Sequence, residues 1–254
     1  MILERYEWGD ACAPPLILVH GVGSRAESFQ RVAEEEWGRH FRVIAFDLRG
    51  HNRSGWEPPW THATYVADLV ESVKALGIDR AHWAGYSFGG RLLLDLAAAE
   101  PGLVERAVLL EPVIRISPEL AMRRATEELT GDVWDSVEAF LRGHGATGAI
   151  SPEQLAQAAT SFDELPDGRV RRRTCQAAIV SVFSEFAAQA PAPETLTMPT
   201  MLLYAPAFEL VTPDQRAAYE PYLDTVVEVP GMHDIFATAY EQTASSVTRF
   251  LLAQ

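Results

Sequence analysis

The sequence predicts an α/β protein with a mostly parallel central sheet flanked by helices. In the first half of the chain, short apolar segments alternate with helical patterns, which is typical of parallel strands joined by helical crossovers. This alternation stops after residue 112 and strand-like segments return near residue 200. The 254 residues, 48% of them hydrophobic, can bury a full core. We therefore expect one sheet whose two halves are separated by an insertion.

The expected strands are short segments rich in apolar residues, several of them β-branched, as buried parallel strands are. They are residues 15–19, 42–46, 81–84, 104–110, 200–204 and 225–229. The expected helices of the core are residues 26–37, 64–76, 88–99 and 235–252. Within residues 64–76, apolar side chains recur at helical spacing on one face.

The insertion covers residues 113–197, which we call the lid segment. It is poor in strand patterns and is interrupted by glycines and prolines. We predict an all-helical lid that covers the carboxyl ends of the strands, where ligands bind in open α/β sheets. The predicted organisation is a first core part at residues 1–112, the lid segment, and a second core part at residues 198–254.

Charge and composition exclude several classes of protein. With 21 Lys plus Arg against 35 Asp plus Glu, the net charge is −14, so nucleic acid and stable membrane association are not expected. No apolar run approaches the ~20 residues that span a bilayer, and the amino-terminal residues do not resemble a signal peptide, so a cytoplasmic enzyme is expected. Cys12 and Cys175 stand apart, and no metal-ligand spacing is visible, so we expect neither metal nor cofactor.

The strongest chemical signal is the segment from Gly85 to Gly90, which matches G-x-S-x-G between a strand and a helix. A sharp, strained turn at this place projects Ser87 into a crevice. The N–H group of Phe88 then lies at a helix N-terminus, where it can stabilise an oxyanion. Ser87 is therefore the predicted nucleophile.

Two further loops follow predicted strands. In the loop after the first strand, the N–H of Val22 is the second predicted oxyanion donor, and His20 is expected to fix the loop by hydrogen bonds. His233 follows the last predicted strand, C-terminal to the lid segment. Histidine can accept the serine proton near neutral pH, and this chain order suits a Ser…acid…His arrangement. We predict His233 as the base.

Four ordered motifs resemble those of the α/β-hydrolase fold family. They are His20-Gly-Val-Gly-Ser, Asp47-Leu-Arg-Gly-His-Asn-Arg-Ser-Gly55, Gly85-Tyr-Ser-Phe-Gly-Gly90 and Gly231-Met-His-Asp234. The resemblance spans nearly the whole chain except the lid segment, although Asn52 stands where the family usually has glycine. It implies a structural role for Asp47 and Arg49, which would tie their loop to the sheet.

The resemblance also implies an acid that orients His233. In the family this acid usually follows the strand after the lid, where this chain has Glu209. Glu111, at the end of the strand before the lid, is the alternative, because some family members place their acid there. Glu209 is the preferred prediction, and Asp214 and Asp234 are less favoured.

A serine nucleophile favours acyl transfer to water over the dehalogenase and epoxide hydrolase reactions of this fold, which use Asp. We predict a serine carboxylesterase or lactonase, with acyl-homoserine lactones as one plausible substrate class, and a small-molecule ester or lactone as its partner. The alternatives are a C–C bond hydrolase, with Arg115 or Arg123 holding a substrate carboxylate, and a non-catalytic ligand receptor. The predicted pocket residues are Phe29, Tyr86, Trp134 and Phe140. The oligomeric state stays open.

Overall fold

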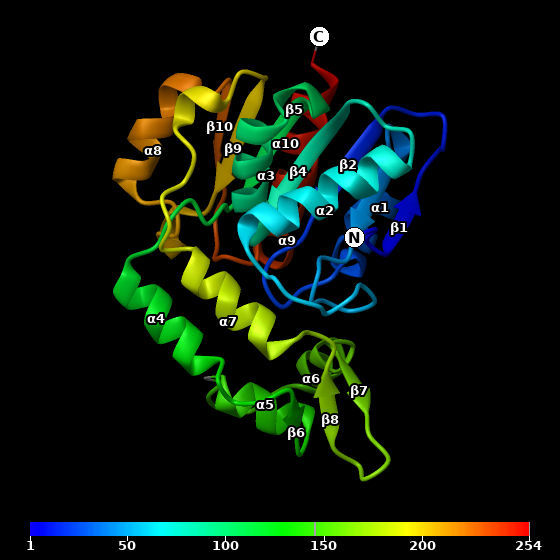
Figure 1. Ribbon diagram of the computed structural model, residues 1–254, viewed down its shortest axis with the longest axis vertical. Helices are drawn as coiled ribbons and strands as arrows, with labels where there is room; N and C mark the ends of the chain where they lie inside the picture. Colours follow the sequence, from blue (N-terminus) through cyan, green and yellow to red (C-terminus); the bar gives the residue numbers. More distant parts are fainter. Residues whose placement is uncertain (145, 254) are drawn as a thin grey trace.

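The computed structural model describes residues 1–144 and 146–253. A sheet with helices on both faces forms one end of the molecule, and much of the lid segment projects from the other end (Figure 1). Seven strands form this sheet in the order β1-β3-β2-β4-β5-β9-β10. Their bounds are β1 Arg5–Trp8, β2 Pro15–Val19, β3 Arg42–Phe46, β4 Ala81–Tyr86, β5 Val104–Leu110, β9 Thr200–Tyr204 and β10 Thr225–Glu228.

Neighbouring strands pair in parallel throughout this sheet, except that β1 pairs antiparallel with β3 at one edge. The predicted strands therefore all form, and the mostly parallel sheet is confirmed. Strand β1 was not predicted, because its four residues alternate between exposed and half-buried positions and are partly charged.

Helices cover both faces of the sheet, as the alternation of side chains along a strand requires. Ile17 and Val19 of β2 belong to a cluster with residues of α2 and α3, whereas Leu16 and Leu18 belong to a cluster with residues of α1 and α10. The core helices are α1 Gln30–Glu35, α2 His62–Ala75, α3 Phe88–Ala99, α8 Pro213–Tyr219, α9 Ile235–Thr238 and α10 Tyr240–Leu252. Short 3-10 turns are η1 Ala26–Phe29, η2 Trp37–Arg39, η3 Pro101–Leu103, η4 Pro193–Thr195, η5 Pro206–Phe208 and η6 Glu220–Tyr222.

The lid segment is not all-helical, so that part of the prediction is wrong. Its described residues form four α-helices and also a second sheet of three strands in the order β6-β8-β7. The elements are α4 Pro118–Glu127, β6 Val133–Trp134, α5 Val137–Gly143, α6 Pro152–Ala159, β7 Phe162–Glu164, β8 Val170–Arg172 and α7 Gln176–Glu185. These strands have two or three residues each, too few to produce a recognisable alternation in the sequence.

Arg91 of α3 fastens both ends of the lid segment to the core. Its side chain is 2% exposed and donates to the carbonyl of Ile114 at 2.8 Å, where the chain enters the lid segment. It also donates to the carbonyls of Ala188 and Gln189, where the chain returns to the core.

Among the residues that the structure describes, every helix is too short or too polar to span a bilayer.

Candidate active site

The candidate site lies at the carboxyl ends of the parallel strands, beside the point where the strand order reverses between β2 and β4. Ser87 is the single residue between β4 and α3, and it has φ 54° and ψ −111°, a conformation that non-glycine residues rarely adopt. A Cβ atom on Gly85 would overlap the carbonyl of Gly89, and one on Gly89 would overlap the carbonyl of Val19. The predicted tight turn is therefore present, and it depends on both glycines.

Three side chains from distant parts of the sequence meet at this turn. Ser87 Oγ lies 3.0 Å from His233 Nε2, and His233 Nδ1 lies 3.2 Å from Glu111 Oε2. His233 is positioned by the loop between β10 and α9. In the tautomer that satisfies both contacts, Nδ1–H donates to the carboxylate and Nε2 accepts from the serine hydroxyl.

The acid that contacts His233 is Glu111, so the prediction that Glu209 accepts this hydrogen bond is wrong. Glu111 directly follows β5, the strand that lies between β4 and β9 in the sheet, and its side chain is fully buried. Its Oε1 accepts from the N–H of Ala205 at 2.6 Å, which leaves Oε2 for the imidazole. Glu209 follows η5 in a left-handed conformation with φ 56° and lines the cavity with an exposed side chain.

Two aromatic rings enclose the imidazole of His233. The ring centroid of Phe208 lies 4.9 Å away with an interplanar angle of 18°, and that of Tyr86 lies 5.2 Å away at 26°. The Tyr86 hydroxyl also donates to the His233 carbonyl at 2.9 Å. Burial raises the pKa of Tyr86, so its phenol stays a neutral donor near pH 7. These contacts fix the plane of the His233 ring. Sequence reasoning missed Phe208, because nothing in its local pattern points to the site.

The loop after β2 passes directly beside the nucleophile. A Cβ atom on Gly21 would lie 3.2 Å from the Cβ atom of Ser87, and Val22 lines the cavity. His20 holds this loop as predicted: Nδ1 contacts the carbonyl of Gly21 at 2.7 Å, and Nε2 accepts from Leu48 N at 3.0 Å. Burial lowers the pKa of His20 to about 4, so the ring is neutral near pH 7.

A second buried histidine supports the same loop. His51 Nε2 accepts from the N–H of Gly23 at 3.1 Å, and Nδ1 contacts the carbonyl of Arg49 at 3.0 Å. Burial, reinforced by the neighbouring His20, lowers the pKa of His51 to about 3. Asp47 and Arg49 have structural contacts, but to η1 and α2 and not to the sheet as predicted: the Asp47 carboxylate accepts from the N–H of Ala26 at 2.9 Å. Arg49 pairs with Asp68 at 2.7 Å.

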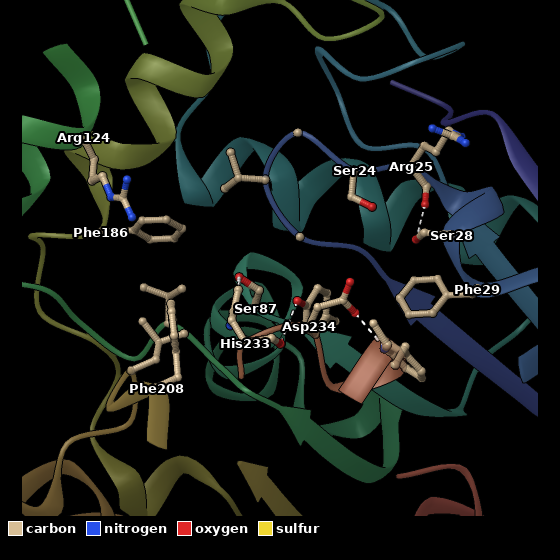
Figure 2. Close-up of a pocket in the computed structure, with 18 of the residues that line it drawn as sticks. Ser24, Arg25, Ser28, Phe29, Ser87, Arg124, Phe186, Phe208, His233 and Asp234 are labelled. Atoms are coloured by element: carbon tan, nitrogen blue, oxygen red, sulfur yellow. Dashed lines mark hydrogen bonds between the residues drawn. The ribbon is translucent and has the colours of Figure 1, made fainter. Parts of the chain in front are cut away.

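A cavity of about 980 Å³ opens beside Ser87 and His233, between the sheet edge and the lid segment (Figure 2). Phe29 and Tyr86 line it, as predicted. Among the described residues, its walls do not include Trp134 or Phe140, so both pocket predictions are wrong. Their rings pack on each other inside the lid segment, with centroids 5.4 Å apart.

The two arginines considered as carboxylate anchors lie in different settings. Arg123 lines the cavity. Arg115 instead donates to the carbonyl of Ala187 and to the side chain of Gln189, outside the cavity walls that the structure describes.

Within the described residues, no group of three or more His, Cys, Asp or Glu side chains is arranged to hold a metal ion.

Comparison with known proteins agrees with this architecture. The model of the alpha/beta hydrolase fold family matches residues 14–218. The chain is 30% identical to the lipase LipV of Mycobacterium tuberculosis (strain ATCC 25618 / H37Rv) over 221 residues, which cover 85% of this chain and 82% of that protein.

Two solved structures resemble the whole chain. E-2-(acetamidomethylene)succinate hydrolase superposes with a TM-score of 0.85 at 23% identity, covering 99% of this chain and 95% of that one. The enol-lactonase from Burkholderia xenovorans LB400 superposes with a TM-score of 0.82 at 22% identity, covering 99% and 96%. At these identities the likeness shows the fold alone. The family match, together with the fold, shows that the chain belongs to the alpha/beta hydrolase fold family.

Proposed function

We propose that this protein is a serine hydrolase that cleaves carboxylic esters, including lactones, through an acyl-enzyme intermediate. The observation that carries the proposal is the continuous series of contacts from Ser87 Oγ to His233 Nε2 at 3.0 Å and from His233 Nδ1 to Glu111 at 3.2 Å. This is the arrangement that activates a serine hydroxyl, which is otherwise a weak nucleophile.

In the proposed reaction, His233 Nε2 takes the proton of Ser87 as Oγ attacks the carbonyl carbon of the ester. His233 then gives this proton to the leaving alkoxide, and the alcohol departs from the acyl-enzyme. A water molecule, deprotonated by the same nitrogen, attacks the acyl carbon, and His233 returns this proton to Ser87 Oγ as the acid is released. The Glu111 carboxylate stabilises the imidazolium that forms in each half of the cycle.

The N–H groups of Val22 and Phe88 are the proposed donors to the tetrahedral oxyanion. Phe88 is the first residue of α3, and the N–H groups in a first helical turn lack partners within the helix. Val22 lies in the loop that passes beside Ser87 and is fixed by His20. Donors held before the reaction can stabilise the developing charge without reorganisation.

The relatives favour ester chemistry on this site. The name of LipV describes a lipase, and one of the similar structures is an enol-lactonase, so acyl–oxygen bonds are the proposed substrate class. The cavity of about 980 Å³ is lined mainly by apolar side chains, among them Phe29 and Phe186, which suits an acyl chain. Lactones, including acyl-homoserine lactones, belong in the same substrate screen.

The test is hydrolysis of a series of p-nitrophenyl esters and lactones by the wild type and by Ser87→Ala. We expect Ser87→Ala to lower kcat by about 10⁴-fold or more, because the covalent pathway is lost, while circular dichroism remains unchanged. Ser245→Ala on the exposed face of α10 is the matched control and should keep full activity. Equal turnover by the wild type and Ser87→Ala would refute the proposal.

A further inference from the structure

The charged side chains that line the cavity reverse the charge balance of the whole chain. The protein has 21 basic and 35 acidic residues, yet the cavity walls contain four arginines and two carboxylates. The arginines are Arg25, Arg31, Arg123 and Arg124, and the carboxylates are Glu209 and Asp234. A basic lining inside an acidic protein favours a negatively charged ligand, because the local field attracts it.

Two of these arginines each pair with a separate acid and also contact the cavity wall. Arg25 donates to Ser161 at 2.8 Å and lies 3.2 Å from a carboxylate oxygen of Glu27. Arg31 pairs with Glu35 at 3.1 Å and lies over the ring of Tyr240. Each of these two guanidinium groups therefore has a carboxylate partner of its own.

Arg123 and Arg124, on lid helix α4, share a single acid. Glu127 lies 3.8 Å from Arg123 and 3.1 Å from Arg124. The neighbouring Glu128 is engaged by Arg172 at 2.8 Å. The two guanidinium groups are therefore matched by one carboxylate, which leaves one positive charge at this end of the cavity. Both side chains are solvent-accessible, at 69% and 53% exposure, so a ligand can reach them.

An apolar wall connects the nucleophile with these arginines. Val113, Ile116 and Leu120 all line the cavity, and the N–H of Val113 donates to the carbonyl of Ser87 at 3.1 Å. Arg124 lies four residues after Leu120 on α4, so both side chains project from one face of the helix. Figure 2 shows the side chain of Arg124 extending from α4 toward Phe186.

We propose that the substrate carries a carboxylate at the end of an apolar chain, and that Arg124, assisted by Arg123, binds this carboxylate while the ester group reacts at Ser87. The inference rests on the proposed ester hydrolysis. A carboxylate is proposed because a guanidinium group can bind it through two hydrogen bonds, and a phosphate monoester is the rival ligand in the binding test.

The experiment compares kcat/KM for charged and uncharged esters of matched length, with proton release as the readout. Monomethyl suberate is compared with methyl octanoate, which places the carboxylate on the acyl arm. 6-Acetoxyhexanoate is compared with hexyl acetate, which places it on the alcohol arm. We expect the wild type to prefer the charged member of at least one pair by about tenfold, and the preference to fall as salt is added.

Arg124→Gln should bring this ratio close to one. The control is Arg142→Gln, which removes the same charge from another lid helix, where Arg142 pairs with Glu138 at 3.2 Å outside the cavity walls. This control should keep the wild-type ratio and rate. Hydrolysis of uncharged esters without any preference, or a preference that survives Arg124→Gln, would overturn the inference and leave the proposed function standing.

A binding measurement separates the inference from catalysis. Calorimetric titration of Ser87→Ala should detect tighter binding of the preferred charged ester than of its uncharged analogue, and Arg124→Gln in that background should remove the difference. Hexyl phosphate is the second probe. If it binds more tightly than hexanoate, the carboxylate assignment is wrong. If no ester is hydrolysed by the wild type while the charged ester still binds through Arg124, the proposed reaction fails and the anionic site remains.

Discussion

The edge of the central sheet and the lid segment differ in how firmly their side chains are held. At the sheet edge, Ser87 is 7% exposed and Glu111 is fully buried, and each is hydrogen-bonded by main-chain groups of neighbouring strands. In the lid segment, helix α4 buries only Ala121 and Ala125, and Met122 is 69% exposed. The contrast predicts that the proposed reaction depends on tight packing of the core, whereas the proposed selection of the substrate depends on the exposed side chains of the lid segment.

The largest expected effect comes from the two candidate acids, of which Glu111 is buried and Glu209 is exposed. Glu111→Gln should lower kcat by about 10³- to 10⁴-fold, because the amide no longer stabilises the imidazolium or fixes the tautomer of His233. Glu209→Gln, which changes an exposed side chain without a contact to His233, should change kcat by less than about threefold. Steady-state hydrolysis of one ester by both variants makes the comparison. The opposite order of effects would contradict the assignment of Glu111.

The connection between the two regions can be broken at Arg91. Arg91→Met leaves three main-chain carbonyls and Asp95 without their donor, so we expect a loss of about 3–5 kcal/mol in the free energy of unfolding. Urea denaturation measures this loss. The control is Arg169→Met, which removes an exposed pair with Asp167 in the lid segment and should leave the free energy of unfolding almost unchanged. Equal effects would show that Arg91 does not fasten the lid segment to the core.

A smaller effect concerns acid stability of the loop beside the nucleophile. The pKa of His51 falls from 6.5 in the unfolded chain to about 3 in the fold, so below pH 6.5 the unfolded chain binds a proton that the folded chain excludes. The stabilising contribution is complete above pH 6.5 and is lost as the pH falls toward 3. Between pH 6.5 and pH 5 the loss is about 2 kcal/mol for this residue.

His51→Gln removes the titrating group, so its free energy of unfolding should decline less steeply with falling pH than that of the wild type. The variant is expected to be less stable at pH 7, because a flexible glutamine side chain does not hold both Gly23 and Arg49 as the rigid ring of His51 does. Urea denaturation at pH 7, 6 and 5 gives both quantities. Parallel curves for the two proteins would contradict the assigned protonation of His51.

Much of the fold could be predicted because its core obeys simple periodicity. Buried parallel strands such as Pro15–Val19 and Thr200–Tyr204 are apolar or nearly so along their whole length. Each is followed by a turn that contains a glycine or a proline. The glycines around Ser87 are required by close approach of the backbone, so their spacing identifies the turn. His233 was predicted from its place in the loop after the last strand, C-terminal to the lid segment.

The acid and the pocket could not be settled in the same way. Glu111 and Glu209 both follow a strand, and only the arrangement of β5 beside β4 brings Glu111 to His233. In the lid segment, Trp134 and Phe140 are aromatic residues of the kind that often lines a pocket, but their rings pack against each other. Tertiary contacts decide such cases, and short strands such as Val133–Trp134 leave too little pattern to anticipate them.

The central claim is that the hydroxyl of Ser87 is activated by His233. It is tested most directly by the rate at which a fluorophosphonate labels the protein, with the modified residue located by peptide mass spectrometry. We predict one adduct per chain, on Ser87, with labelling slowed by at least about a hundredfold in His233→Ala. An adduct on another residue, or labelling of Ser87 at the same rate in wild type and His233→Ala, would contradict the account.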